Sequence, residues 1–190
     1  GSEMCIRDST NTTGLTSFDT NGFSTGSMQN VNKNTSTYVA WQWKANGGTT
    51  SSNSDGGITS TVQANTTAGF SIVTYTGGGS ATTVGHGLGK VPSLIILKRR
   101  DSTNSWLVKH QNSTSNKNLQ LHTTNAELTT SDFTGGIIGD LSSSTVFSTV
   151  AGSSGVVNVS SSNDFIAYCF TDIKGYSKFG SYTGNGNTDG

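Results

Sequence analysis

The sequence nearly repeats itself, and this constrains its fold more than any other feature. Three segments occur twice: 38–43 (YVAWQW) returns as 165–170 (FIAYCF), 75–79 (YTGGG) as 182–186 (YTGNG), and 23–25 (FST) as 147–149 (FST). Aromatic residues and alanine keep their places in the longest pair. A unit that recurs along a chain indicates modules used in series, in which the repetition itself is part of the design.

The spacing of these echoes predicts the domain boundaries. The distance from Tyr38 to Phe165 exceeds that from Tyr75 to Tyr182 by 20 residues. The extra residues fall near 46–57, a run of Gly, Ser and Asn that cannot bury apolar surface and is typical of a linker or surface loop. We therefore expect the C-terminal part of one β module in 10–45, the linker or loop in 46–57, a nearly whole module in 58–175, and the first strand of a third module in 176–190.

The first nine residues are set apart from this scheme. Residues 4–9 (MCIRDS) back-translate to a nucleotide sequence that resembles the transposon end used in library adapters. We interpret 1–9 as a sequencing artefact, with a native disordered tail as the alternative, and exclude it from the fold prediction.

Composition favours strands over helices. The chain has 25 Gly, one Pro and only 12% charged residues, and Ser and Thr make up roughly a third of it, which suits turns. Apolar runs bounded by turn residues predict strands at 70–75, 91–98, 105–110, 118–122, 156–159 and 165–170. Many short strands spaced by turns predict an all-β fold of antiparallel β-sandwich or jelly-roll-like modules in tandem.

Charge, hydropathy and cysteine content narrow the function. The net charge is zero and the largest basic cluster is 98–100 (KRR), so we expect no nucleic-acid binding. No apolar stretch approaches the length of a membrane span, so we expect no membrane insertion. With Cys5 set aside, Cys169 stands alone in a strand and predicts a small core residue.

Several segments carry a family resemblance. Residues 58–77 (ITSTVQANTTAGFSIVTYTG), 84–92 (VGHGLGKVP), 94–100 (LIILKRR) and 175–184 (GYSKFGSYTG), with the 38–43 and 165–170 echo, resemble a repeat domain of unknown function in tail-fibre and other virion structural proteins of marine tailed phages. The resemblance covers nearly all of 14–190. It implies a virion protein assembled in the host cytoplasm, with a homotrimer and other virion proteins as partners.

His86 is one of three candidate ligand-binding residues. It lies among glycines in 85–89 (GHGLG), and Gly-rich loops can hold anions with backbone N–H groups. Phosphate loops open onto a helix, whereas this one opens onto Pro92 and a strand. A structural turn with glycines at positive φ is therefore the favoured interpretation. His110 and His122 lack paired ligand spacing, so no metal or other cofactor is predicted.

Trp106 and Arg100 are the other two candidates. Trp106 follows a polar turn and either packs in the core or stacks on a sugar ring. Arg100 ends a strand and either is solvated or contacts an anionic glycan. Trp41 and Trp43 share one face of a strand, and their echo by Tyr168 and Phe170 predicts core packing.

No arrangement of residues predicts catalysis. Glycoside hydrolysis needs two carboxylates at a defined separation, but Glu127 is the one Glu outside 1–9. The Asp residues are scattered and lie mostly in turns: Asp101, Asp132, Asp140 and Asp164. No nucleophile elbow is present. We therefore expect a structural spacer with host-surface adhesion as a further role. The alternatives are a receptor-binding module that holds glycan with loops 77–89 and 130–144, or a cellular adhesin repeat.

Overall fold

The computed structural model describes residues 12–45, 49–132, 136–150, 157–158 and 162–188. The chain divides into two compact units, Asp8–Trp43 and Lys44–Gly190. Residues 1–9, which we interpret as a sequencing artefact, lie outside the described residues.

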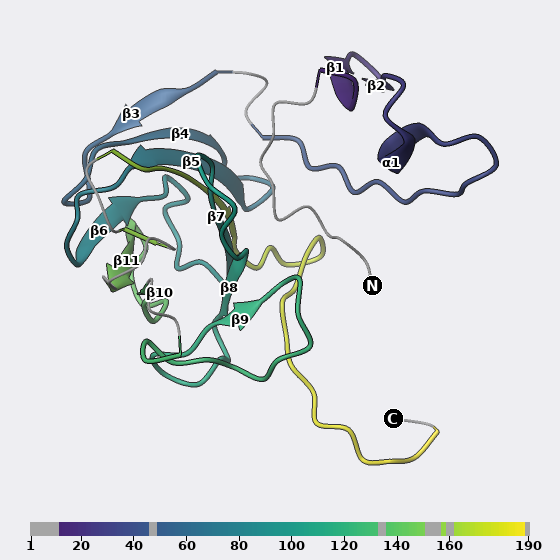
Figure 1. The fold of residues 1–190 in the computed structure, drawn as a ribbon. Helices are drawn as coiled ribbons and strands as arrows, with labels where there is room; N and C mark the ends of the chain where they lie inside the picture. Colours follow the sequence, from purple (N-terminus) through teal and green to yellow (C-terminus); the bar gives the residue numbers. More distant parts are fainter. Residues whose placement is uncertain (1–11, 46–48, 133–135, 151–156, 159–161, 189–190) are drawn as a thin grey trace. The chain divides into compact units, whose positions relative to one another are not determined.

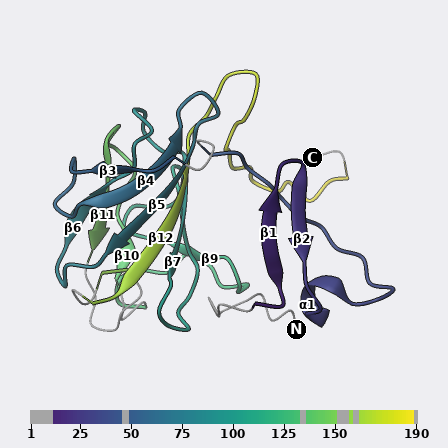
Figure 2. The same ribbon diagram turned by 90° about the horizontal axis from the view of Figure 1, so that it is seen from above.

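The larger unit is built from two antiparallel sheets. The large sheet has the strand order β3-β4-β5-β12-β7-β8-β9, and the small sheet has the order β10-β11-β6. Figures 1 and 2 show the small sheet lying against one face of the large sheet, which curves around it. The strands are β3 (Ser51–Asn53), β4 (Ser60–Asn65), β5 (Phe70–Thr76), β6 (Thr82–Gly85), β7 (Leu94–Arg99), β8 (Leu107–His110), β9 (Leu119–Gln120), β10 (Ile137–Ile138), β11 (Val146–Val150) and β12 (Asp164–Phe170). The expected all-β antiparallel, sandwich-like fold is confirmed.

The core lies between the two sheets and follows the period of two in each strand. In β5, Val73 and Tyr75 point inward and are buried, while Thr74 and Thr76 lie on the outer face. Tyr75 stacks on Phe165 of β12, with ring centroids 5.1 Å apart, and meets Phe147 of the small sheet edge-on at 6.2 Å. These aromatic contacts join the two sheets.

The outer face of the large sheet carries a second, smaller apolar cluster. Phe70 and Phe170 pack on each other with ring centroids 4.8 Å apart, and Phe179 packs on Phe170 at 5.6 Å. Partly buried Ile96 of β7 joins this cluster. The continuous apolar run predicted at 91–98 is thus a strand with apolar groups on both faces, although the strand begins only at Leu94, after Pro92.

Two buried side chains tie loops to the sheets with polar contacts. Lys109 Nζ lies 2.8 Å from Asp140 Oδ1 and donates to the carbonyl oxygens of Thr114 and Lys117 at 3.2 and 3.0 Å. The hydrogen bond from Lys109 lowers the pKa of Asp140 to about 2. Asn118, also buried, bonds both the N–H and the C=O of Ile138 in β10. The large and small sheets are therefore connected by specific hydrogen bonds as well as by apolar packing.

The smaller unit is a hairpin followed by a short helix and an extended segment. β1 (Leu15–Asp19) pairs with β2 (Gly22–Thr25), and α1 (Gln29–Asn32) follows. The Tyr38 hydroxyl then donates to Gln29 O and accepts from Lys33 N, each at 2.9 Å. These bonds fix the start of an extended stretch that has no strand pairing among the described residues.

Several sequence predictions differ from the structure. The strand predicted at 156–159 is not seen at Val157 and Asn158, which lie in a bend, and residues 156 and 159 lie outside the described residues. Part of the range predicted as a linker or loop, Ser51–Asn53, is an edge strand whose polar residues pair with β4 through the backbone. The first strand of a third module was predicted in 176–190, but the described residues 176–188 contain no strand. Trp41 and Trp43 are 78% and 54% exposed rather than packed in a core, because their segment has no partner strand here. The predicted division into tandem modules stays a prediction.

Candidate functional site

A polar hollow of about 220 Å³ opens on the outer face of the large sheet, where β4, β5 and β12 lie side by side. It lies near the end of β5 and the start of β12, because β12 pairs with β5 in a register that sets Asp164 against Thr76. Its lining comprises Thr59, Thr61, Thr74, Tyr75, Thr76, Arg100, Asp164 and Phe165.

The polar groups of this hollow are ordered by hydrogen bonds. Thr76 Oγ1 donates to Asp164 Oδ1 at 2.9 Å, and the backbone N–H of Arg100 donates to Asp164 O at 2.7 Å. The neighbouring Arg99 is held by Asp101, with 2.5 Å between Nε and Oδ1, and this bond lowers the pKa of the Asp101 carboxyl. Hydroxyl, carboxylate and guanidinium groups together can bind several hydroxyls of one sugar or another polyol.

Of the three candidate residues from the sequence, only Arg100 lines this hollow. Trp106 is half-buried just before β8, where its carbonyl accepts from Leu121 N at 3.1 Å, and is not a lining residue. Sequence reasoning missed Asp164 and the threonines. The alternation of Thr74 and Thr76 with inward Val73 and Tyr75 was a usable signal for an outer polar face, but the place of Asp164 depends on strand pairing.

His86 is fully buried in a turn that leads away from β6. Its Nδ1 accepts from Leu88 N at 3.2 Å, so Nε2 carries the proton and faces Ser143 O at 3.4 Å. Gly87 and Gly89 both have φ of +68°, as the predicted structural turn requires. The turn is confirmed, and in it the His86 ring contacts the protein rather than solvent.

The free energy of unfolding should fall in mildly acidic solution because of His86. Burial lowers its pKa below the usual 6.5, since the imidazolium would lose its hydration and its bond from Leu88. The unfolded chain therefore binds the proton more readily, and stability is lost as the pH drops below about 6.5. We expect a lower urea midpoint at pH 5.5 than at pH 7.5, and a smaller difference in His86→Gln. Equal pH dependence in both proteins would contradict this role.

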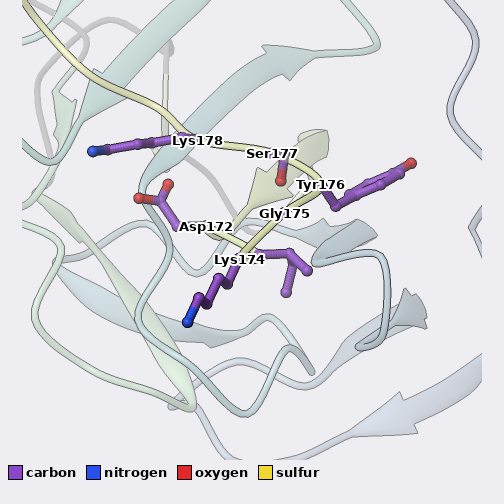
Figure 3. A pocket seen from close by; sticks show the side chains of 7 residues that line it. Asp172, Lys174, Gly175, Tyr176, Ser177 and Lys178 are labelled. Atoms are coloured by element: carbon purple, nitrogen blue, oxygen red, sulfur yellow. The ribbon is translucent and has the colours of Figure 1, made fainter.

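A second, wider depression of about 610 Å³ is lined by one continuous segment, 172–178. Figure 3 shows the long side chains of Lys174, Tyr176 and Lys178 pointing in different directions. Ser177 N donates to Ile173 O at 2.9 Å, and Gly175 has φ of +78°. This depression is the open side of a turn, and its side chains do not converge on one point.

The buried reactive groups are held in unreactive states. Burial raises the pKa of the Cys169 thiol to about 12 and raises that of Tyr75 as well. Lys98 Nζ donates to the carbonyls of Arg99 and Ser102. Among the described residues, no three His, Cys, Asp or Glu side chains are grouped so that they can hold a metal ion.

The two loops proposed from the sequence as a binding face are partly core. Residues 77–89 include β6, in which Val84 is buried, and end near buried Leu88. Residues 130–144 include buried β10, and 133–135 lie outside the described residues.

These features define an all-β, sandwich-like domain with a polar hollow on the outer face of its large sheet. Residues 2–190 match the family described as Domain of unknown function (DUF7483), and the chain belongs to this family. No curated protein and no solved structure matches the chain. No helix in the described part of the chain is long and apolar enough to cross a membrane.

Proposed function

We propose that this chain is a structural repeat module of a fibre-like array, without catalytic activity. The observation that supports the proposal is where the sequence echoes fall in the fold. One copy of each echo lies wholly or partly in a strand of the sandwich: 147–149 lie in β11, 165–170 in β12, and the first two residues of 75–79 at the end of β5. The echoed residues are thus those that make the sheets and the core, as expected of repeated sandwiches.

The second copies are consistent with parts of further sandwiches. Residues 23–25 lie in β2, which pairs with β1 much as β11 pairs with β10. Residues 38–43 follow at a spacing similar to that between β11 and β12. The order of a hairpin and then an aromatic segment is therefore kept in the smaller unit.

We further propose that the array belongs to a phage virion. The support is the resemblance of 58–77, 84–92 and 94–100 to virion repeat domains, together with the zero net charge. In this proposal the chain is a spacer in a tail or surface fibre, forms homotrimers, contacts other virion proteins and is assembled in the host cytoplasm.

Sedimentation velocity of the full chain tests the array. Between about 1 and 100 μM we expect the mass to rise from one chain towards three, because weak contacts between copies need high concentration. A single-chain mass over the whole range would contradict the proposal. Electron microscopy of a native particle with a specific antibody would test the virion location.

Weak adhesion to host-surface glycan is a second candidate role. Exposed Arg100 and Asp164 with neighbouring threonine hydroxyls favour it. Glycan-array binding that is lost in Arg100→Ala and kept in Lys90→Ala would support this role. Binding lost in Trp106→Ala but kept in Arg100→Ala would instead favour the tryptophan.

A further inference from the structure

We propose that residues 12–43 act as the last three strands of a second sandwich, and that their partner is the β3–β9 part of a further module of this family. The inference rests on the proposed repeat array and deepens it by naming the surfaces that the smaller unit needs. It does not depend on the virion location or on a trimer.

The hairpin of β1 and β2 has the strand register of β10 and β11. The echo aligns β2 with β11, so that Thr25 takes the place of Thr149. Leu15 lies opposite Thr25, and Ile138 lies opposite Thr149. The turns that join the two pairs of strands differ in length, as loops between equivalent strands commonly do. The shared register is a property of the fold and supports the echo independently.

β2 and β11 also turn the same edge towards the strand that they share a hairpin with. Ser24 O accepts from Thr16 Oγ1 at 3.0 Å, and Ser148 O accepts from Gly139 N at 2.9 Å. In an antiparallel strand, the backbone groups of successive residues face opposite edges. The residues on either side of Ser24 therefore direct their N–H and C=O groups away from β1, as those on either side of Ser148 direct theirs towards β6.

That edge of β11 is covered, whereas the same edge of β2 is not. β6 pairs with β11, with Val84 opposite Phe147 and Thr82 opposite Thr149. Among the described residues, the sheet that holds β2 consists of β1 and β2 alone. A two-stranded hairpin by itself is marginally stable in water. A strand like β6 is therefore the neighbour that β2 lacks.

The apolar face of the hairpin lacks the cover that β10 and β11 have. Phe147 is 2% exposed and meets Tyr75 of the large sheet, whereas its equivalent Phe23 is 38% exposed. Ile138 is fully buried, whereas its equivalent Leu15, on the same face as Phe23, is 47% exposed. The surface that would bury this face is the inner face of a large sheet.

Residues 38–43 lack the neighbours that make β12 a central strand. β12 pairs with β5 on one side and β7 on the other, whereas 38–43 have no strand pairing in the described part of the chain. Tyr38 takes the place of Phe165, and Trp43 takes the place of Phe170. Phe165 and Phe170 are buried, but Tyr38 and Trp43 are 49% and 54% exposed. Strands like β5 and β7 would bury both aromatic side chains.

One position of this segment places a polar group in the predicted core. Gln42 takes the place of Cys169, which is fully buried and lies opposite Ser71 of β5. A buried amide needs hydrogen-bond partners. The Ser71 hydroxyl donates to His86 O at 2.7 Å, so its oxygen can accept from an amide at the Gln42 position.

The larger unit of a complete second copy does not offer the required surface, because its own β10, β11 and β12 fill it. β6 pairs with β11 along one edge and accepts from Ile58 N through Thr83 O, at 3.1 Å, on the other. The partner is therefore a β3–β9 region that has the smaller unit in place of its own last strands.

Completing the smaller unit tests the inference. An added copy of residues 44–134 is placed directly before residue 12, in place of 1–11, so that Leu15 has the spacing that Ile138 has in the larger unit. Phe23→Cys is combined with Val84→Cys in the added copy, and the protein is oxidised in a glutathione buffer. We expect about tenfold more intramolecular disulfide than from Ser24→Cys with the same Val84→Cys, because a shift of one residue points the thiols to opposite faces. Buried Cys169 stays reduced in both proteins.

Hydrogen exchange of the 38–43 amides is a second measurement. We expect exchange to be at least about tenfold slower in the extended chain than in the chain itself, because strand bonds on both sides would replace bonds to water. Val73→Asp in the added copy is the matched control. It places a charge at a position that is fully buried in the larger unit, so both the preferred disulfide and the slower exchange should be lost.

The outcomes separate this inference from the proposed function. Equal yields from the in-register and shifted pairs would overturn the inference. An added copy that stays unfolded beside an intact larger unit would also overturn it, because the same residues fold when β10, β11 and β12 complete them. Neither result bears on the sedimentation of the unextended chain, which tests the array. A preferred in-register disulfide supports the inference whether or not the chain forms trimers.

Discussion

Phe165→Ala is expected to lower the free energy of unfolding of the larger unit by about 3–5 kcal/mol. The Phe165 ring is fully buried in the central part of the large sheet and stacks on Tyr75 at 5.1 Å. Removing the ring loses the free energy gained by burying it and leaves a cavity between the sheets. The cavity cannot close, because β12 is held in place by β5 on one side and β7 on the other. A loss of this size is a large part of the stability of a small domain.

Urea unfolding followed by circular dichroism measures this effect, with two matched variants. Phe165→Leu keeps much of the apolar volume, so we expect a clearly smaller loss. Tyr182→Ala removes the echoed aromatic residue that is 94% exposed, and we expect a change within about 0.5 kcal/mol in dilute solution. Similar losses for Phe165→Ala and Tyr182→Ala would contradict the placement of the core.

Sequence patterns predicted those strands that combine apolar runs with clear turns. The segments that became β5, β7, β8 and β12 have this form, and the hairpin of β7 with β8 across a polar turn is confirmed. β3 was missed because Ser51-Ser52-Asn53 has no apolar face, and its place at the sheet edge depends on backbone bonds to β4. β10 has only two residues, too few for a periodic signal.

The echo predicted which residues are equivalent, but the core packing that it predicted for Trp41 and Trp43 was wrong. Tyr168 and Phe170 have a neighbouring strand on each side, whereas Trp41 and Trp43 have none among the described residues. Burial depends on the partner strand as well as on the side chain. Conservation of aromatic character between repeats therefore indicates a packing position, and the packing itself requires the rest of the module.

The candidate site was only partly predictable from the sequence, because it too depends on which strands pair. Arg100 was identified from its place at the end of an apolar run, but Asp164 lies 64 positions further along the chain. The two meet because Arg100 N bonds Asp164 O, next to the antiparallel pairing of β7 with β12. The burial of Lys98 and Lys109 was also unforeseen, since it depends on loop carbonyls that lie within reach of each ammonium group.

Asn118→Ala is expected to cost about 2–4 kcal/mol, the second largest effect. The Asn118 amide is fully buried: Nδ2 donates to Ile138 O at 2.9 Å and to Lys117 O at 2.7 Å, and Oδ1 accepts from Ile138 N at 2.8 Å. Alanine would leave these backbone groups without partners in a site closed to water. Asn112→Ala, which removes an exposed amide, should change stability by less than about 0.5 kcal/mol.

Asn118→Asp separates the hydrogen bonds from the shape of the side chain. The carboxylate keeps the acceptor for Ile138 N but turns an oxygen towards two carbonyl oxygens, so at pH 7 we expect a loss at least as large as in Asn118→Ala. A protonated carboxyl can donate one of the lost bonds, so the difference in unfolding free energy between Asn118→Asp and the wild type should shrink as the pH falls towards 4. Urea titrations at pH 7 and pH 4 measure both values. If Asn118→Asp were as stable as the wild type at pH 7, the two donated bonds would contribute nothing to the stability of the fold.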